Sequence, residues 1–273
     1  MVTLCKSVYE KELIVYIESW LYKRYANIFD VIFSSFKKCT ASFFCPNSLY
    51  IYHKARYTIR DKLSDTIVFC DPTDKNWIFM LINAFEMWCS SQLSCTIIHG
   101  SLFVYKDVGV ILSGKRKSGK TTLLKYFTEQ LDVKYIDDDS VYYIKNSYWG
   151  FNLPVSMREN GGNNNVMLTF DEEAHPRYLF FYDQAKRIGH TEKVDYILFP
   201  EYSSEEAMLK IEKLPSSVVF NRLMNNIRGY KGIQNLYNDV SAIVSSTEAY
   251  SIKYCHCEQV LEFIEHLRCP ERL

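Results

Sequence analysis

The first strongly patterned stretch of the chain lies near its N-terminus. Apolar residues recur there at steps of three and four, with charged residues such as Glu18, Lys23 and Asp30 between them. This spacing places the apolar side chains on one face of a helix, and it predicts a packing helix over residues 7–38. Its polar face carries too few basic residues for a helix that lies on a membrane surface.

The period of the pattern shortens between residues 43 and 70. Leu49, Ile51 and His53 recur at every second position, which predicts alternating strands in a small meander. Residues 75–92 return to a helical pattern. The first part of the chain therefore predicts a small α+β section, and none of its residues suggests a reaction.

Three short apolar segments follow, and they predict strands: Thr96–Gly100, Leu102–Tyr105 and Val108–Leu112. The pair Lys106-Asp107 between the last two predicts a tight hairpin turn. The segment Lys120–Leu131 then has helical composition. The order of strand, polar loop and helix is the context that a phosphate-binding loop requires.

The loop between that strand and that helix reads GKRKSGKT, from Gly114 to Thr121, and matches the pattern G-x-x-x-x-G-K-[ST]. Glycines permit the backbone angles that turn successive amides toward an anion, and the start of the helix adds a positive end. Lys120 is expected to reach the β- and γ-phosphates of a nucleotide, and the Thr121 hydroxyl is expected to hold Mg²⁺. The expected nucleotide-binding residues are Gly114, Lys117, Ser118, Gly119, Lys120, Thr121 and Thr122.

A further predicted strand ends in three consecutive aspartates, Asp137, Asp138 and Asp139. Asp137 follows Thr121 by 16 residues and is expected on the next strand of the same unit, where its carboxylate could reach the metal. One carboxylate of such a cluster would hold the ion, and its neighbour would accept a proton from an attacking hydroxyl. Without the loop before them, three aspartates would indicate a solvated turn, and Asp139 fits that alternative best.

Composition excludes several other classes of protein. The 32 basic residues balance the 32 acidic residues, which argues against nucleic acid as the main partner. No apolar run approaches the length of a membrane span. The nine cysteines form no CxxC pair, and the start of the chain does not resemble a secretion signal. These features predict free thiols and a cytoplasmic protein.

These motifs together resemble the catalytic domain of HPr kinase/phosphorylase. The resemblance is carried by IIHGSLFVYKDVGVILSGKRKSGKTTLLKYF and YIDDDSVYYI, and it extends more weakly over about residues 95–270. It implies an α/β fold with a P-loop kinase core of that type over residues 93–273. A small α+β N-terminal section, residues 1–92, would precede this core.

The resemblance also implies ATP and Mg²⁺ as cofactors. Lys120 and the loop amides would bind the phosphates, and Thr121 with Asp137 would bind the metal. Asp137 or Asp138 would act as the base toward a hydroxyl, and the residues leave this choice open. His99 would support the acidic cluster, although its own context, after an apolar run, is typical of a core histidine.

The family's later Glu-Ile-Arg-Gly type segment has no clear counterpart, because RENGGNNNVML stands near that place. We therefore expect a kinase of an acceptor other than HPr, with a serine or threonine of a peptide or protein as the first choice. A kinase of a small molecule and a nucleotide-gated binding protein share the same motifs and are the alternatives. The expected partners are a nucleoside triphosphate and a hydroxyl acceptor, and the resemblance is compatible with an oligomer.

Overall fold

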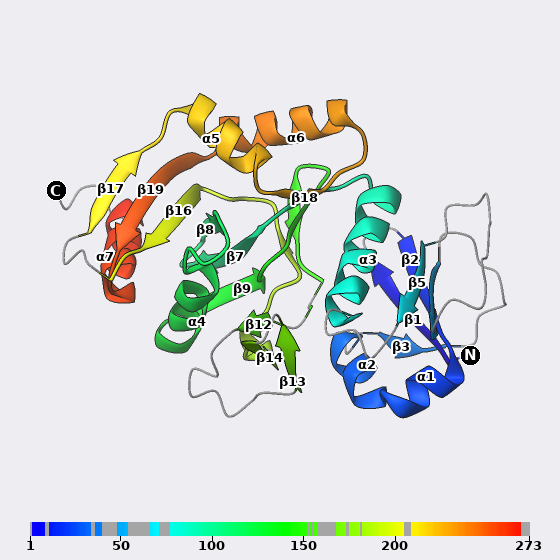
Figure 1. Ribbon diagram of the computed structural model, residues 1–273. Helices are drawn as coiled ribbons and strands as arrows, with labels where there is room; N and C mark the ends of the chain where they lie inside the picture. The colour runs from blue at the N-terminus through cyan, green and yellow to red at the C-terminus, as the bar shows by residue number, and fades with distance from the viewer. Residues whose placement is uncertain are drawn as a thin grey trace. The chain divides into compact units, whose positions relative to one another are not determined.

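The fold is a mixed α/β arrangement, seen here in a computed structural model (Figure 1). The structure describes residues 2–8, 11–33, 36–39, 48–53, 66–70, 77–151, 153, 155–157, 168–172, 175–180, 182–204 and 209–268. The chain divides into two compact units. Unit 1 comprises Met1–Cys95 and Asn152–Phe181, and unit 2 comprises Thr96–Phe151 and Tyr182–Leu273. The sequence predicted two consecutive parts, residues 1–92 and residues 93–273. The division seen in the structure instead joins the internal segment Asn152–Phe181 to the N-terminal unit.

Unit 1 is built on a five-stranded sheet of order β3-β1-β2-β4-β5. Its strands are β1 (Val2–Val8), β2 (Lys11–Ile17), β3 (Lys37–Lys38), β4 (Leu49–His53) and β5 (Thr66–Cys70). The pairs β1–β2 and β1–β3 are antiparallel, and β2, β4 and β5 run parallel. Its helices are α1 (Ser19–Arg24), α2 (Ala26–Ile32) and α3 (Trp77–Gln92).

The helix predicted over residues 7–38 is wrong at both ends, and its C-terminal end is strand β3. The segment Lys11–Ile17 is strand β2, and helices begin only at Ser19. Leu13 and Ile17 fit helical spacing, but the segment pairs with β1 on one side and β4 on the other, and Val15 and Tyr16 between them are equally buried. The predicted strand around β4 and the predicted helix at α3 are both present.

Unit 1 also contains a three-stranded antiparallel sheet of order β12-β14-β13. Its strands are β12 (Val155–Met157), β13 (Leu168–Glu172) and β14 (His175–Phe180). The described part of the chain contains no helix long and apolar enough to cross a membrane.

Unit 2 is organised around a six-stranded sheet of order β17-β19-β16-β8-β7-β9. The strands are β7 (Gly100–Tyr105), β8 (Val108–Ser113), β9 (Val133–Asp137), β16 (Tyr196–Tyr202), β17 (Lys210–Lys213) and β19 (Glu248–Tyr254). Strands β8, β16 and β19 are parallel, while β7 is antiparallel to both β8 and β9. The carboxyl ends of β8, β9, β16 and β19 therefore meet the amino end of β7 at one edge, which we call the carboxyl edge.

A second five-stranded sheet of unit 2 has the order β15-β11-β10-β6-β18. Its strands are β6 (Thr96–Ile98), β10 (Val141–Ile144), β11 (Ser147–Trp149), β15 (His190–Thr191) and β18 (Ile227–Gly229). The helices of unit 2 are α4 (Lys120–Gln130), the 3₁₀ helix η1 (Gln184–Lys186), α5 (Ser216–Met224), α6 (Ile233–Ser246) and α7 (Cys257–Arg268).

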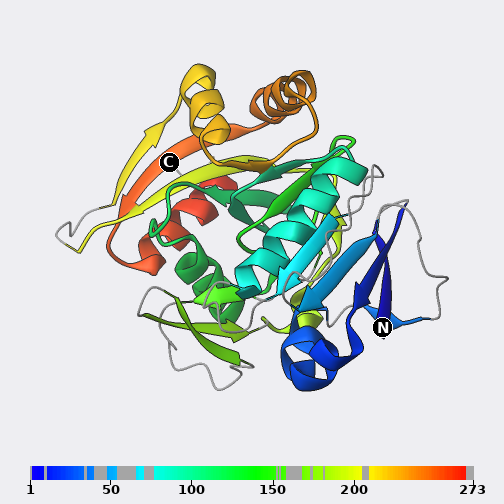
Figure 2. The ribbon, with the colours of Figure 1, turned by 45° about the vertical axis from the view of Figure 1, so that its right-hand side comes forward.

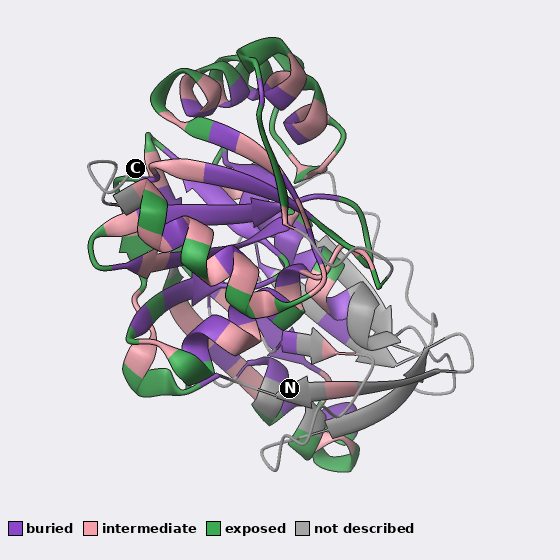
Figure 3. Cartoon of the chain, turned by 90° about the vertical axis from the view of Figure 1, so that its left-hand side faces the viewer, coloured by how far each residue is buried: buried purple, intermediate pink, exposed green. Residues whose placement is uncertain are grey.

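The two faces of the six-stranded sheet bury different layers. On one face, Phe103 of β7 packs on Phe127 of α4 with ring centroids 5.3 Å apart, and α7 packs on β19. On the other face, a core cluster that includes Ile111 and Ile197 joins the sheet to α5 and α6 (Figures 1 and 2). Figure 3 shows the central strands buried and the outer sides of the helices exposed. This packing fixes the strand ends that meet at the carboxyl edge.

The hairpin that joins β7 to β8 turns at Lys106-Asp107, as predicted. Both residues have positive φ, 47° and 69°, which is the conformation that matches the twist of a two-residue hairpin. The turn sets the pairing of Gly100 with Ser113 at the other end of the hairpin. The start of β7 is thereby placed beside the end of β8.

Candidate functional site

The loop predicted to bind phosphates connects β8 directly to α4 at the carboxyl edge. Gly114, Lys117 and Gly119 have φ values of 151°, 71° and 95°. Residues of positive φ that alternate with ordinary ones turn successive amides toward one side, the arrangement known as an anion nest. Helix α4 begins at Lys120 with no side-chain cap and no acidic residue in its first turn. Its amino end is therefore suited to an anion.

Gly119 occupies a position that admits no side chain. Its φ of 95° is strained for other residues, and a Cβ there would collide with the Tyr254 hydroxyl. The Tyr254 ring is almost fully buried and cannot move aside easily. Glycine at this position thus lets the loop backbone lie directly against Tyr254.

Lys120 is folded back over the loop. Its Nζ donates to the carbonyl oxygens of Gly114 and Lys115, at 3.0 Å and 3.1 Å. Burial lowers the pKa of Lys120, and the charges of Asp139 and Asp138 act in the opposite direction. A phosphate oxygen could replace those carbonyls and would satisfy the charge better.

The Ser118 hydroxyl offers a second indication that the loop accepts a ligand. Its Oγ is buried and has no hydrogen-bond partner among the described residues. Buried polar atoms are almost always hydrogen-bonded. A phosphate oxygen in the loop would supply the missing partner, so these residues fit a nucleotide. Of the other predicted contacts, Lys117 and Thr122 are exposed beside the loop.

Asp138 is the acidic side chain that meets the loop. Its Oδ1 accepts hydrogen bonds from Ser101 Oγ and, at 2.9 Å, from the Asp139 amide. The Thr121 side chain lies close enough to this carboxyl group to lower its pKa, and the Tyr182 hydroxyl lies 3.4 Å from Oδ2 and 3.3 Å from the Thr121 carbonyl oxygen. Burial raises the pKa of Asp138, while Ser101 and Thr121 work against that rise.

Asp137 faces away from the loop, toward backbone. Its Oδ2 accepts from the Phe151 amide at 2.7 Å, and its Oδ1 accepts from the Asp138 amide at 3.1 Å. Burial raises the pKa of Asp137 to about 7, although these bonds and the charge of Arg187 oppose the rise. The structure therefore brings Asp138, rather than Asp137, to Thr121.

Asp139 is held between the side chains of His99 and Arg228. His99 Nδ1 lies 3.2 Å from its Oδ1, and the Arg228 guanidinium lies 2.8 Å from its Oδ2. Partial burial acts to raise the pKa of Asp139, but the bond from His99 and the charge of Arg228 outweigh it and hold that pKa well below its usual range. Arg228 also donates to Ser140 Oγ at 3.1 Å. His99 thus contacts the acidic cluster through Asp139, the aspartate that the sequence suggested leaving to solvent.

Three residues of this site were missed by sequence reasoning: Ser101, Tyr182 and Arg228. Ser101 had a weak signal, because it lies two positions after His99 at the start of the hairpin. Tyr182 and Arg228 follow Asp138 by 44 and 90 positions, and no motif points to them. Burial raises the pKa of Tyr182 well above its ordinary value, so its hydroxyl stays a donor toward Asp138.

The arrangement could hold a divalent ion only with help from a ligand. Within the described ranges, no group of three or more His, Cys, Asp or Glu side chains is placed to bind a metal. Thr121 and Asp138 are the two oxygen donors that meet at the loop. Mg²⁺ is commonly bound in this way, by one or two protein oxygens together with substrate phosphates and water, so the donor set fits that ion.

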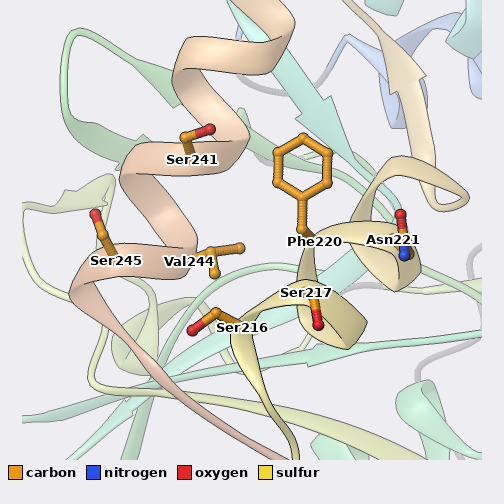
Figure 4. Close-up of a pocket in the computed structure, with 7 residues that line it drawn as sticks. All are labelled: Ser216, Ser217, Phe220, Asn221, Ser241, Val244 and Ser245. Carbon is orange, nitrogen blue, oxygen red and sulfur yellow. The ribbon is translucent and has the colours of Figure 1, made fainter.

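An open pocket of about 510 Å³ lies elsewhere in unit 2, between α5 and α6 (Figure 4). It is lined by Ser216, Ser217, Phe220, Asn221, Ser241, Val244 and Ser245. Among the described residues, no charged side chain lines it, and none of the residues of the loop or the acidic cluster contributes to it. It offers no group suited to acid–base chemistry.

Fold and site together define a mixed α/β protein with a glycine-containing loop between a parallel strand and a helix. No protein-family model matches the chain, and no curated protein matches it. A solved structure described as the HPr(Ser) kinase/phosphatase from Coxiella burnetii is similar to 65% of this chain and 99% of its own, with 11% identity and a TM-score of 0.37. A likeness this distant does not place the chain in a family, so its function has to be inferred from the site.

Proposed function

We propose that this protein is an ATP- and Mg²⁺-dependent kinase that transfers the γ-phosphate to a hydroxyl group, with a serine or threonine of a peptide or protein as the favoured acceptor. One observation carries the proposal. The Tyr182 hydroxyl lies 3.3 Å from the carbonyl oxygen of Thr121, the threonine of the phosphate loop, and 3.4 Å from Oδ2 of the buried Asp138 carboxyl group. That arrangement puts a metal-binding hydroxyl and a proton acceptor at the same end of the loop.

The loop would bind the triphosphate through its amides, the amino end of α4, Ser118 and Lys120. Lys120 would exchange its present carbonyl partners for β- and γ-phosphate oxygens. Thr121 and Asp138 would hold Mg²⁺, which supplies neutralising charge to the phosphates when it is bound. The sequence suggested Asp137 as the metal ligand. The orientation of the two side chains favours Asp138 instead.

Asp138 would also receive the proton of the acceptor hydroxyl. In that step a bond forms between the hydroxyl oxygen and the γ-phosphorus, and the bond between that phosphorus and the bridging oxygen of the leaving nucleoside diphosphate breaks. The hydroxyl proton passes to the Asp138 carboxylate. Burial raises the pKa of Asp138 and makes it a better base. Ser101 and Tyr182 would hold the carboxyl group in position. Most of the rate would come from positioning and charge stabilisation.

Asp137, Asp139, His99 and Arg228 would act as positioning residues. Asp137 anchors the end of β9 to the backbone at Phe151. His99 and Arg228 hold Asp139, and with it the turn that follows Asp138. We further propose that unit 2 is a divergent catalytic core of the HPr kinase type. The order of His-Gly, hairpin, phosphate loop, helix and aspartates supports this.

The test is binding and transfer measured on the same preparation. Calorimetry with Mg-ATP should show binding by the natural protein and its loss in Lys120→Ala. Mass spectrometry after incubation with Mg-ATP, a serine- and threonine-containing peptide library and a panel of small alcohols should show phosphorylation of a peptide. Labelling confined to small alcohols would identify a small-molecule kinase. Binding without any transfer would indicate a nucleotide-gated binding protein, and equal binding by Lys120→Ala would remove the proposal altogether.

A further inference from the structure

The carboxyl edge has two sides relative to the loop. The acidic cluster lies on the side of β7 and β9, because Asp138 and Asp139 follow β9 and Ser101 is the second residue of β7. Strands β16 and β19 pair on the other side of β8. A triphosphate with its γ-phosphate at the acids has its other end directed away from them. The nucleoside would therefore extend toward the ends of β16 and β19.

Tyr202, the last residue of β16, lies on that side of the loop. Its Cβ is 3.7 Å from the place where a Cβ on Gly119 would be. Its ring is held edge-on by the ring of Tyr254, with centroids 5.9 Å apart and an interplanar angle of 69°. The Tyr254 ring is itself almost fully buried, so it fixes one edge of its neighbour. Tyr202 remains 54% exposed.

We propose that Tyr202 is a stacking surface for the base of the bound nucleotide. This inference rests on the proposed function and adds a residue to its site. A large aromatic ring that is steadied at one edge and open to solvent beside a phosphate loop is suited to the flat face of a base. Stacking of a base on an aromatic side chain tolerates every base, because each has a π face. The site would accordingly bind ATP and GTP with similar affinity.

The experiment compares nucleotides with a ligand that has no base. Calorimetry in Mg²⁺ would measure tripolyphosphate, ATP and GTP on the natural protein and on Tyr202→Ala, Tyr202→Phe and Tyr237→Ala. Tyr202→Ala should weaken ATP and GTP by about 5- to 150-fold, the range that base–aromatic stacking supports. It should leave tripolyphosphate unchanged. Tyr202→Phe should bind like the natural protein, and so should Tyr237→Ala, in which an exposed tyrosine of α6 is removed.

The possible results separate this inference from the function on which it rests. Natural affinity for ATP in Tyr202→Ala would overturn the stacking role alone. An equal loss for ATP and tripolyphosphate in that variant would overturn it too, since the change would then act on the loop. If the natural protein binds neither ligand, the phosphate site fails and the stacking role fails with it.

Discussion

Asp137 and Asp138 are neighbours in the chain but have different partners. Successive side chains at a strand end point to opposite sides. One carboxyl group consequently bonds to the amides of Phe151 and Asp138, while the other reaches Ser101 and Thr121. The first arrangement is typical of a side chain that holds the backbone in place. The second arrangement, that of Asp138, is suited to a carboxyl group that takes part in a reaction.

Asparagine substitution at each aspartate should separate these roles. Asp138→Asn should keep its fold and most of its affinity for ATP, and it should lose transfer, because an amide cannot accept the proton. In Asp137→Asn an amide nitrogen would face one of two backbone N–H groups, which should cost about 1–3 kcal/mol of unfolding free energy. Urea unfolding and single-turnover transfer measure the two effects. Equal losses of stability in both variants would contradict the proposed difference in role between Asp137 and Asp138.

Gly119 should be the least replaceable residue of the loop. Gly119→Ala adds strain at a φ of 95° and a collision with Tyr254, and it should cost about 1–3 kcal/mol of stability together with most of the nucleotide affinity. Gly189→Ala is the matched control, because no atom of the described residues lies within 4 Å of the added atom. Its stability should change by no more than about 0.5 kcal/mol. Removal of the hydroxyl in Gly119→Ala/Tyr254→Phe should restore part of the loss.

The sequence was sufficient for the residues of the loop and insufficient for their partners. Gly114 to Thr121 could be recognised because a phosphate loop requires those residue types at fixed spacing. The choice of Asp138 over Asp137 depends on which way a side chain points at the end of β9. Arg228 reaches Asp139 from β18, and only the sheet order shows that these segments meet.

At the scale of elements, the separation between the loop and the acids is set by a strand that lies between them. Asp137 was expected on the next strand of the unit and ends β9 as predicted, but in the sheet β7 lies between β8 and β9. Strands β8 and β9 still run parallel, since β7 is antiparallel to both. The inserted strand also brings Ser101 to the acids, and His99 directly precedes it. Periodicity predicted each of these strands and could not give their order.

The helices of unit 1 show a second limit of periodicity. Helical spacing of apolar residues predicted one long helix, but the structure has β2 and then the short α1 and α2. A bond between the two helices accounts for part of their arrangement. The Tyr22 hydroxyl of α1 donates to the Asp30 carboxylate of α2 at 2.5 Å. That bond is the first cause of a rise in the pKa of Tyr22 to about 12.

The Tyr22–Asp30 bond should give unit 1 a stability that depends on pH. The pKa of Tyr22 is higher in the folded than in the unfolded protein, so its contribution is complete below about pH 10 and is lost as the pH rises toward about 12. Tyr22→Phe should cost about 1–3 kcal/mol at neutral pH, as expected for a bond to a charged group. Urea unfolding of both proteins from about pH 7 to about pH 11 measures this. A stability difference that stays constant over this range would speak against the bond.

At the scale of the whole molecule, the division into units interrupts the order of the chain. Unit 1 includes Asn152–Phe181, which lies between two segments of unit 2. Reading along a sequence finds composition shifts and cannot detect a segment that returns to an earlier unit. The α/β class was nevertheless predictable, because strands alternate with helices around the phosphate loop.

Ligand binding should stabilise unit 2 in particular, since the candidate site lies within it. Mg-ATP at about 100 times its dissociation constant should add about 2.7 kcal/mol to the unfolding free energy of the unit that binds it. Hydrogen exchange followed by mass spectrometry should show slower exchange over residues 113–124 and 137–140. AMP is the control, because it lacks the phosphates that the loop would hold. Equal protection by AMP would point to a different binding mode.

The two-residue turn at Lys106-Asp107 sets the pairing register at the distant end of its hairpin. Gly100 faces Ser113 because the two arms have equal length. An added or deleted residue would rotate Ser101 to the opposite face of the sheet and away from Asp138. The number of residues in the hairpin therefore determines whether Ser101 faces Asp138, and with it the alignment of the two parts of the site. A library that varies the identity of the turn residues, but keeps their number, should preserve that alignment.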